Sequence, residues 1–208
     1  MKKIIDLLGK GNKNIQNKIV LMAVLISILI FCVVFFSAHK PLKLEDEEMT
    51  FTTNKGNVIE TEYKDFGKFY MKIPKDFELL SDELLKIKYP LGNIPKKAYS
   101  NEDTTINIVF NKNEISLNGA SINEYVEVIK KTYTQMGYYY YYFQYDINGI
   151  EIHTISMITS AIDTKIDNYI AIFEIDNEIM MLNFNCIHDL AEEWNPVGKF
   201  LVESIRKK

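Results

Sequence analysis

A run of twenty residues without a charged side chain, residues 19–38, constrains this chain more than any other feature of its 208 residues. As a helix that rises about 1.5 Å per residue, the run spans roughly 30 Å, the thickness of the hydrocarbon core of a bilayer. A helix that packs on a soluble core shows a polar face within such a length. This run shows none, so we expect residues 19–38 to form a transmembrane signal-anchor helix.

Two kinds of processed leader fit this segment less well. A cleaved signal peptide has an apolar stretch of about 7–15 residues and small residues at positions −3 and −1, whereas cleavage after Ala38 would put Phe36 at −3. A lipoprotein signal carries small residues before its cysteine, whereas Cys32 follows Ile30 and Phe31. We therefore expect a permanent anchor, and whether the segment is ever cleaved stays open.

The distribution of lysines predicts the orientation of the chain in the membrane. Residues 1–18 contain five lysines, while Lys40 and Lys43 are the lysines close to the other end of the span. Positive residues are retained in the cytoplasm, so residues 1–18 are predicted to be a cytoplasmic basic tail and the rest of the chain to lie outside the cell membrane. Residues 39–56 contain four consecutive acidic residues, 45–48, and are predicted to be an acidic linker.

The charge of the remaining chain narrows the class of partner. The net charge is −4, and residues 1–37 carry five lysines against one aspartate, a balance of +4, which leaves −8 for the rest. A nucleic-acid partner needs a basic surface, so we expect none.

The two cysteines lie in different parts of the chain, Cys32 in the apolar run and Cys186 in the outer domain. We therefore expect no disulfide within the chain, and Cys186 is expected to be a small buried residue of a strand.

Short strands and three helices are expected along residues 57–208. Ser121 is a suitable N-cap for the clearest helix pattern, and Gly137 follows its end. Asn148-Gly149 is a strong signal for a tight hairpin, and short connections of this kind join antiparallel neighbours. Strands are predicted at residues 58–63, 69–73, 98–100, 104–111, 139–145, 150–162, 169–175 and 179–187, and helices at 81–88, 121–136 and 189–206.

The last strands are apolar on both faces, which decides the expected fold class. Along residues 169–175, alternate positions from Tyr169 to Ile175 make one apolar face, and Ile170 and Ile172 make the other. Strands of this kind need a covering layer on both faces. With three helices to supply the layers, we expect an α+β fold, a three-layer α/β/α sandwich around an antiparallel sheet, preceded by one transmembrane helix.

Three segments of the chain resemble the PsbP-like superfamily. They are FYMKIPKDF at residues 69–77, AYSNEDTTINIVF at 98–110 and FLVESIR at 200–206. The superfamily includes the extrinsic protein of photosystem II, a Ran-binding import factor, and bacterial lipoproteins and membrane-anchored proteins such as DcrB. The resemblance covers residues 57–208 and implies an α/β/α sandwich that acts as an accessory or binding module. It carries over no functional residue, and nothing in the sequence supports a photosynthetic role.

Catalytic and metal-binding signatures are absent from the sequence. The three histidines, His39, His153 and His188, have no second ligand at metal-binding spacing. Residues 163–167 look like the start of a cation loop, but the glycine at the sixth position and the closing glutamate are missing. We therefore predict no catalytic, cofactor-binding or metal-binding residue.

A run of five tyrosines is the compositional oddity of the chain. In a strand, Tyr138, Tyr140 and Tyr142 share one face. If helices cover both faces of the sheet, these rings fill the core and their hydroxyls lie at its rim. If the strand lies at an exposed edge, the three tyrosines form a candidate surface for a protein or glycan partner, because tyrosine is enriched at interfaces.

The anchor, the linker and the folded domain together indicate a non-catalytic, membrane-tethered binding or accessory module outside the cytoplasm, whose partner is a cell-envelope protein or complex. Two alternatives stay open. A ligand-sensing ectodomain would act through a partner, because the cytoplasmic tail of 18 residues is too short for an output domain. An envelope hydrolase would need a pocket that gathers His153 or His188 with a serine and a carboxylate.

Overall fold

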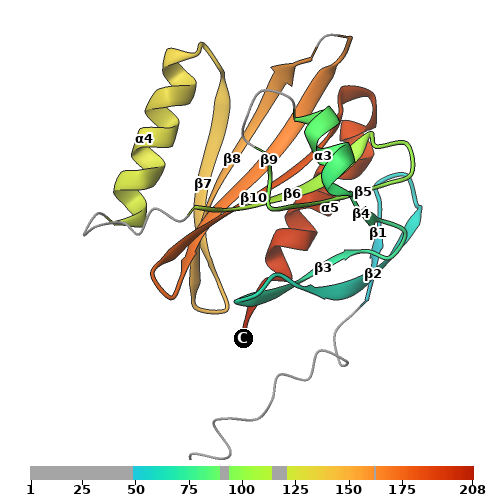
Figure 1. Ribbon diagram of the computed structural model, residues 1–208, viewed down its shortest axis with the longest axis horizontal. Coiled ribbons are helices and arrows are strands. Elements are labelled where there is room, and N and C mark those ends of the chain that lie inside the picture. The colour runs from blue at the N-terminus through green and yellow to red at the C-terminus, as the bar shows by residue number, and fades with distance from the viewer. Residues whose placement is uncertain (1–48, 90–93, 114–120, 162) are drawn as a thin grey trace, which may run out of the picture. The chain divides into compact units, whose positions relative to one another are not determined.

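The structure, a computed structural model, describes residues 49–89, 94–113, 121–161 and 163–208. The predicted basic tail and transmembrane helix, and residues 39–48 of the predicted linker, lie outside these ranges. Within the ranges, no helix is both long and apolar enough to cross a membrane. The described chain is an antiparallel α+β fold, as the sequence predicted (Figure 1).

Seven antiparallel strands form the main sheet, in the spatial order β4-β5-β6-β10-β9-β8-β7. The predicted hairpin at Asn148-Gly149 joins β7 to β8, and both of its residues have positive φ, 54° and 77°, as a tight hairpin turn requires. The strands are β4 (Glu78–Leu79), β5 (Lys97–Ser100), β6 (Ile106–Asn113), β7 (Tyr140–Ile147), β8 (Ile150–Ser160), β9 (Lys165–Ile175) and β10 (Glu178–Ile187).

Four further strands form a second sheet that the sequence did not predict, in the order β1-β2-β3-β11. Strand β1 lies inside the predicted linker, so residues 50–56 belong to the folded domain. Strand β11 follows the last helix, which ends at Glu203 and not at residue 206. The bounds of the four strands are β1 (Thr50–Thr52), β2 (Val58–Asp65), β3 (Phe69–Pro74) and β11 (Arg206–Lys207).

Helix α4 covers one face of the main sheet. A capping box fixes its start, because the Ser121 side chain accepts the N–H of Glu124 and the Glu124 side chain accepts the N–H of Ser121. Val126 of α4 is buried against isoleucines of β8, β9 and β10. At the β4–β6 end of the sheet, α3 packs Leu85 near Val109. The described helices are α3 (Asp82–Lys88), α4 (Ile122–Gln135) and α5 (Ala191–Glu203), the last preceded by a 3-10 turn at His188–Leu190.

The other face of the main sheet is covered by α5 together with the second sheet. Val197 and Leu201 of α5 share a core with Phe69, Met71 and Ile73 of β3, and all five side chains are buried. This outer layer is therefore part helix and part sheet, where the sequence predicted helices alone. The reason is that β3 presents a continuous apolar face, which is buried only when it lies against the main sheet.

Candidate functional site

A cleft of about 590 Å³ opens on the α5 side of the main sheet, beside the edge strand β7. Pockets that bind small molecules have volumes of roughly 300–1,000 Å³, so the cleft has the size of a ligand site. Its lining comes from three adjacent strands, from the segment just before β7 and from α5, and it includes Tyr139, Tyr141, Ser156, Asp167, Tyr169 and Asn195.

Strand register brings the floor of the cleft together. Tyr141 of β7 lies opposite Ser156 of β8, which lies opposite Tyr169 of β9. Two residues further along the strands, Ile158 of β8 lies opposite Asp167 of β9. Directly opposed residues of antiparallel strands share a face, and so do alternate residues of one strand. These side chains therefore point to the same side of the sheet.

The aromatic wall of the cleft is exposed to solvent. The exposed fractions of Tyr139 and Tyr141 are 95% and 75%, and Phe143, on the same face beyond the cleft lining, is 60% exposed. Natural edge strands are usually protected by lysine, proline or a bulge. Strand β7 has no lysine or proline along Tyr140–Ile147. A run of exposed rings on an unprotected edge is typical of an interaction site.

Of the three tyrosines predicted as a partner surface, Tyr138 lines the cleft, whereas Tyr140 and Tyr142 lie outside its lining. Tyr140 and Tyr142 are half-buried and pack against α4, with the Tyr142 hydroxyl 2.8 Å from Nδ1 of His153. Tyr138 is also half-buried and meets the ring of Tyr133 edge-on. The exposed rings are those of the alternate set. Because every residue from 138 to 142 is tyrosine, the sequence pattern carries no signal for which set faces the helix.

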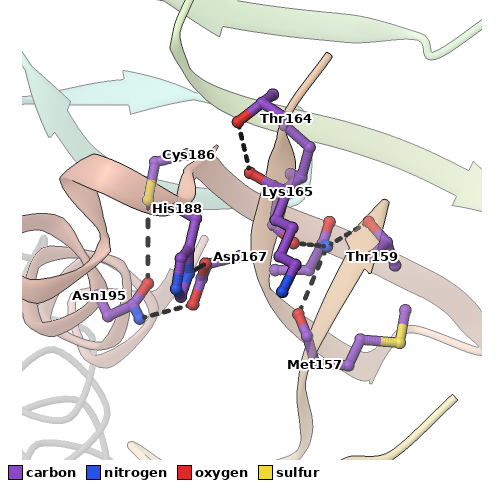
Figure 2. Close-up of polar contacts among 10 residues, drawn as sticks. Met157, Thr159, Thr164, Lys165, Asp167, Cys186, His188 and Asn195 are labelled. Atoms are coloured by element: carbon purple, nitrogen blue, oxygen red, sulfur yellow. Dashed lines mark hydrogen bonds and ion pairs between the residues drawn. The ribbon is translucent and has the colours of Figure 1, made fainter. Parts of the chain in front are cut away.

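A buried carboxylate lies at the polar end of the cleft. Asp167 is 8% exposed, and its Oδ2 accepts a hydrogen bond from Nδ1 of the half-exposed His188 at 2.6 Å. Its Oδ1 accepts from Nδ2 of Asn195 at 3.4 Å. Figure 2 shows these three side chains turned toward one another. The carboxylate is thus held in a fixed orientation by residues that are 21 and 28 positions away in the chain.

Cys186 lies behind this group and has no features of a nucleophile. Its Sγ contacts Oδ1 of Asn195 at 3.9 Å (Figure 2). Burial, and after it the negative charge of Asp167, raise the pKa of the thiol to about 12. The group is therefore a protonated, buried thiol at neutral pH, and nucleophilic chemistry needs the thiolate. The expectation that Cys186 is a buried residue of a strand is confirmed.

A tyrosine pair fixes the floor of the cleft. The hydroxyls of Tyr145 and Tyr169 lie 2.6 Å apart. Burial raises the pKa of Tyr145 well above its usual range, and the hydrogen bond with Tyr169 adds to the shift. The Tyr145 hydroxyl is therefore neutral at physiological pH. The ring of Tyr169 is held in place, in contrast to the exposed rings of β7.

The two histidines considered for a hydrolase lie on opposite faces of the main sheet. His153 is fully buried in the layer under α4, whereas His188 contacts Asp167 beside the cleft. Serines 156 and 160 do line the cleft, but no hydrogen bond in the described part of the chain joins either of them to His188. A serine nucleophile needs that contact with its base. Within the described ranges, no group of three or more histidine, cysteine, aspartate or glutamate side chains is placed to hold a metal ion.

Comparison with known proteins gives a likeness of fold. No protein-family model and no curated protein matches the sequence. The solution structure of the cyanobacterial PsbP protein (CyanoP) of Synechocystis sp. PCC 6803 is similar over 81% of this chain and 100% of its own, with a TM-score of 0.51 and 8% identity.

Two further solved structures have lower TM-scores. A Pseudomonas aeruginosa protein of unknown function matches 71% of this chain and 97% of its own, with a TM-score of 0.46 and 10% identity. A protein of Bacteroides thetaiotaomicron VPI-5482 matches 71% of this chain and 48% of its own, with a TM-score of 0.46 and 12% identity. CyanoP and this chain are only 8% identical, so their similarity concerns the fold alone. What the two proteins have in common is a PsbP-like fold.

Proposed function

We propose that this protein is a non-catalytic binding module. Residues 19–38 tether it to the cell membrane, and its folded domain contacts a cell-envelope partner outside the cytoplasm, as expected of a DcrB-type anchored relative. One observation carries the binding role: the cleft beside β7 is lined both by the exposed rings of Tyr139 and Tyr141 and by the buried, oriented carboxylate of Asp167.

Both halves of that observation support binding. An exposed tyrosine ring contributes little to the stability of the fold, but on contact with a partner it removes a large apolar area from water. A buried carboxylate with fixed partners has lost most of its water on folding, and its orientation is already set before any ligand arrives. A cleft that combines the two is pre-organised for recognition.

The tether rests on the sequence. Residues 19–38 have the length and the apolar character of a membrane span, and the lysines of residues 1–18 favour a cytoplasmic start. The acidic cluster at residues 45–48 is repelled by anionic headgroups, which favours a domain held away from the membrane surface.

Site-specific photo-crosslinking in intact cells tests the proposal. A benzophenone amino acid placed at Tyr139 should form a discrete adduct with one envelope component, because this ring lies at the mouth of the cleft. The same probe placed at Val128, an exposed position of α4, should not form that adduct. Mass spectrometry identifies the adduct, and gel shift after protease or glycosidase treatment shows its chemical class.

A second variant tests whether the cleft is responsible for the adduct. Replacing Tyr141 with alanine, in the chain that carries the probe at residue 139, should abolish the adduct. The proposal is overturned if the probe at residue 139 forms no adduct, or if the adducts from residues 139 and 128 are the same.

A further inference from the structure

We propose that the cleft beside β7 binds a neutral saccharide chain. This deepens the binding role proposed above and rests on it. Three properties of the lining lead to this ligand class. The backbone at Ser156, Asp167 and Tyr169 is paired on both sides, the walls are flat aromatic rings, and the charges of the lining cancel.

The floor of the cleft is built on interior strands. At Ser156 of β8, and at Asp167 and Tyr169 of β9, the chain pairs with a neighbouring strand on both sides, so the two ladders use the backbone N–H and C=O groups there. Residues 158–160 of β8 pair with β9 alone. A ligand over Ser156, Asp167 and Tyr169 is therefore recognised by side chains alone. An extended peptide depends on free backbone groups at a sheet edge for much of its affinity, and these three floor residues have none to offer.

The rings of the cleft suit a sugar. One face of a pyranose consists of C–H groups, which are apolar and carry a small positive charge, and the face of an aromatic ring is negative. Tyr139 and Tyr141 present such rings to solvent, and Tyr169 presents one at the floor, where Tyr145 holds its hydroxyl. Stacking on these rings would desolvate the tyrosines at little entropic cost, because tyrosine has few rotatable bonds.

The polar groups of the cleft suit hydroxyls. His188 and Asn195 orient the carboxylate of Asp167 through hydrogen bonds. Each carboxylate oxygen accepts one of these bonds and has a further lone pair for a ligand. The Ser156 side chain lies on the same face and can donate or accept. A saccharide supplies many O–H donors for such acceptors.

The charge balance favours a neutral ligand. Among the described residues that line the cleft, the charged side chains are Lys165 and Asp167, one of each sign. An anionic or a cationic ligand would therefore meet as much repulsion as attraction, whereas a neutral polyhydroxyl ligand meets none.

Titration calorimetry on the full-length chain, in a detergent without a sugar headgroup, tests the inference. The probes are the tetrasaccharide of N-acetylglucosamine and cellotetraose, which separate an acetamido sugar from a plain glucan, and tetraalanine as the peptide probe. We expect one of the tetrasaccharides to bind with one site per chain, and tetraalanine not to bind. Tyr141→Ala should weaken that binding about tenfold, the size of one lost aromatic contact.

Matched variants separate the cleft from the sheet edge. Phe143→Ala removes an exposed ring from the same strand and face but outside the lining, and it should leave the affinity unchanged. Asp167→Asn should weaken binding at least as much as Tyr141→Ala, because it removes a charged acceptor. Thermal melts of each variant show that the fold is retained.

Defined outcomes overturn the inference. It is overturned if neither tetrasaccharide binds, or if wild type and Tyr141→Ala bind the tetrasaccharide equally well. It is also overturned if Phe143→Ala loses as much affinity for the tetrasaccharide as Tyr141→Ala does. Binding of tetraalanine that is lost in Tyr141→Ala would overturn the saccharide and leave the binding module intact. The saccharide is also overturned, and the binding module left intact, if the probe at residue 139 crosslinks a protein and neither tetrasaccharide binds in calorimetry.

Discussion

Gly198 shows how packing at one residue opposes the local preference of the chain. It lies inside α5, where glycine costs about 1 kcal/mol relative to alanine in helix propensity. A Cβ at this residue would lie 2.5 Å from Cδ1 of Phe184, whose ring is buried in the core between α5 and the main sheet. The close approach of helix and sheet therefore requires a residue without a side chain.

The first prediction concerns this contact. Gly198→Ala should lower the free energy of unfolding by about 1–3 kcal/mol, although alanine is the better helix former, because the ring of Phe184 must move. Urea denaturation monitored by circular dichroism measures the change. Lys199→Ala, at the next and exposed position of α5, should have a small effect. A Gly198→Ala variant as stable as wild type would show that the ring shifts at no cost.

The tyrosine run marks the limit of prediction at the residue scale. A strand alternates its faces, so the sequence indicates that Tyr139 and Tyr141 oppose Tyr140 and Tyr142. Which pair meets α4 depends on the register of β7 against β8, where Tyr142 lies opposite Ile155. That choice is set by the burial of Ile155 and its neighbours, not by any property of the tyrosines.

At the scale of elements, α5 is attached to the turn between β1 and β2. Pro196 lacks an N–H, so the carbonyl of Glu192 loses its partner within the helix. Asn54 of the turn donates to that carbonyl at 3.4 Å. The next residue, Glu193, is buried and accepts hydrogen bonds from Thr53 and Asn57. A turn that the sequence predicted as linker is thus part of the folded domain.

The second prediction tests this attachment through its charge. The hydrogen bond from Asn57, followed by that from Thr53 and the charge of Lys55, holds the pKa of Glu193 below its usual range. Glu193→Gln keeps the shape but removes the charge, and should cost about 1 kcal/mol at pH 7 because hydrogen bonds to a charged acceptor are the stronger ones. Thermal unfolding of both chains measures the difference.

The pH dependence of this stabilisation follows from the lowered pKa of Glu193 in the folded state. A lowered pKa in the folded state means that the stabilisation is present above the ordinary carboxyl range and is lost as the pH falls through the folded-state pKa. The difference between wild type and Glu193→Gln should therefore shrink in acid. Glu192→Gln, an exposed neighbour, is the matched control. A difference that stays constant down to pH 3 would contradict this account.

At the scale of the whole molecule, the second sheet closes the domain by joining its two ends. Strand β11 pairs with β3, so that Arg206 lies opposite Tyr70 and Lys207 opposite Phe69. Lys208 extends the connection to Asp65 through an ion pair of 2.6 Å. Such pairing between distant segments becomes favourable only after the chain between them has folded, because closing a long loop costs entropy.

The third prediction concerns the orientation of the whole chain, and thiol labelling tests it. In a Cys32→Ser background, a cysteine at exposed position Lys86 should react in intact cells with a maleimide that does not cross membranes. A cysteine at Lys13 should react only after lysis. Native Cys186 does not interfere, because it is fully buried and its pKa is about 12. Labelling of both positions only after lysis would contradict the predicted orientation, and release of the labelled domain from membranes would indicate cleavage.

The sequence by itself determined the features that depend on neighbouring residues. The capping box at Ser121 and Glu124 started α4 where it was predicted, and Asn148-Gly149 formed the predicted turn. The apolar positions of β9 predicted cover on both faces, because each side chain of a strand has only two directions available. These signals are local, so they can be read without knowing where the rest of the chain lies.

Only the tertiary structure decided the second sheet and the cleft. Asp167, His188 and Asn195 meet because β9, the 3-10 turn and α5 pack together, and Glu193 reaches Thr53 across 140 positions. No pattern along the chain records such a meeting, because its free energy comes from burying surfaces that are far apart in sequence. The same packing left Tyr139 and Tyr141 exposed and their neighbours half-buried, and so placed the candidate site.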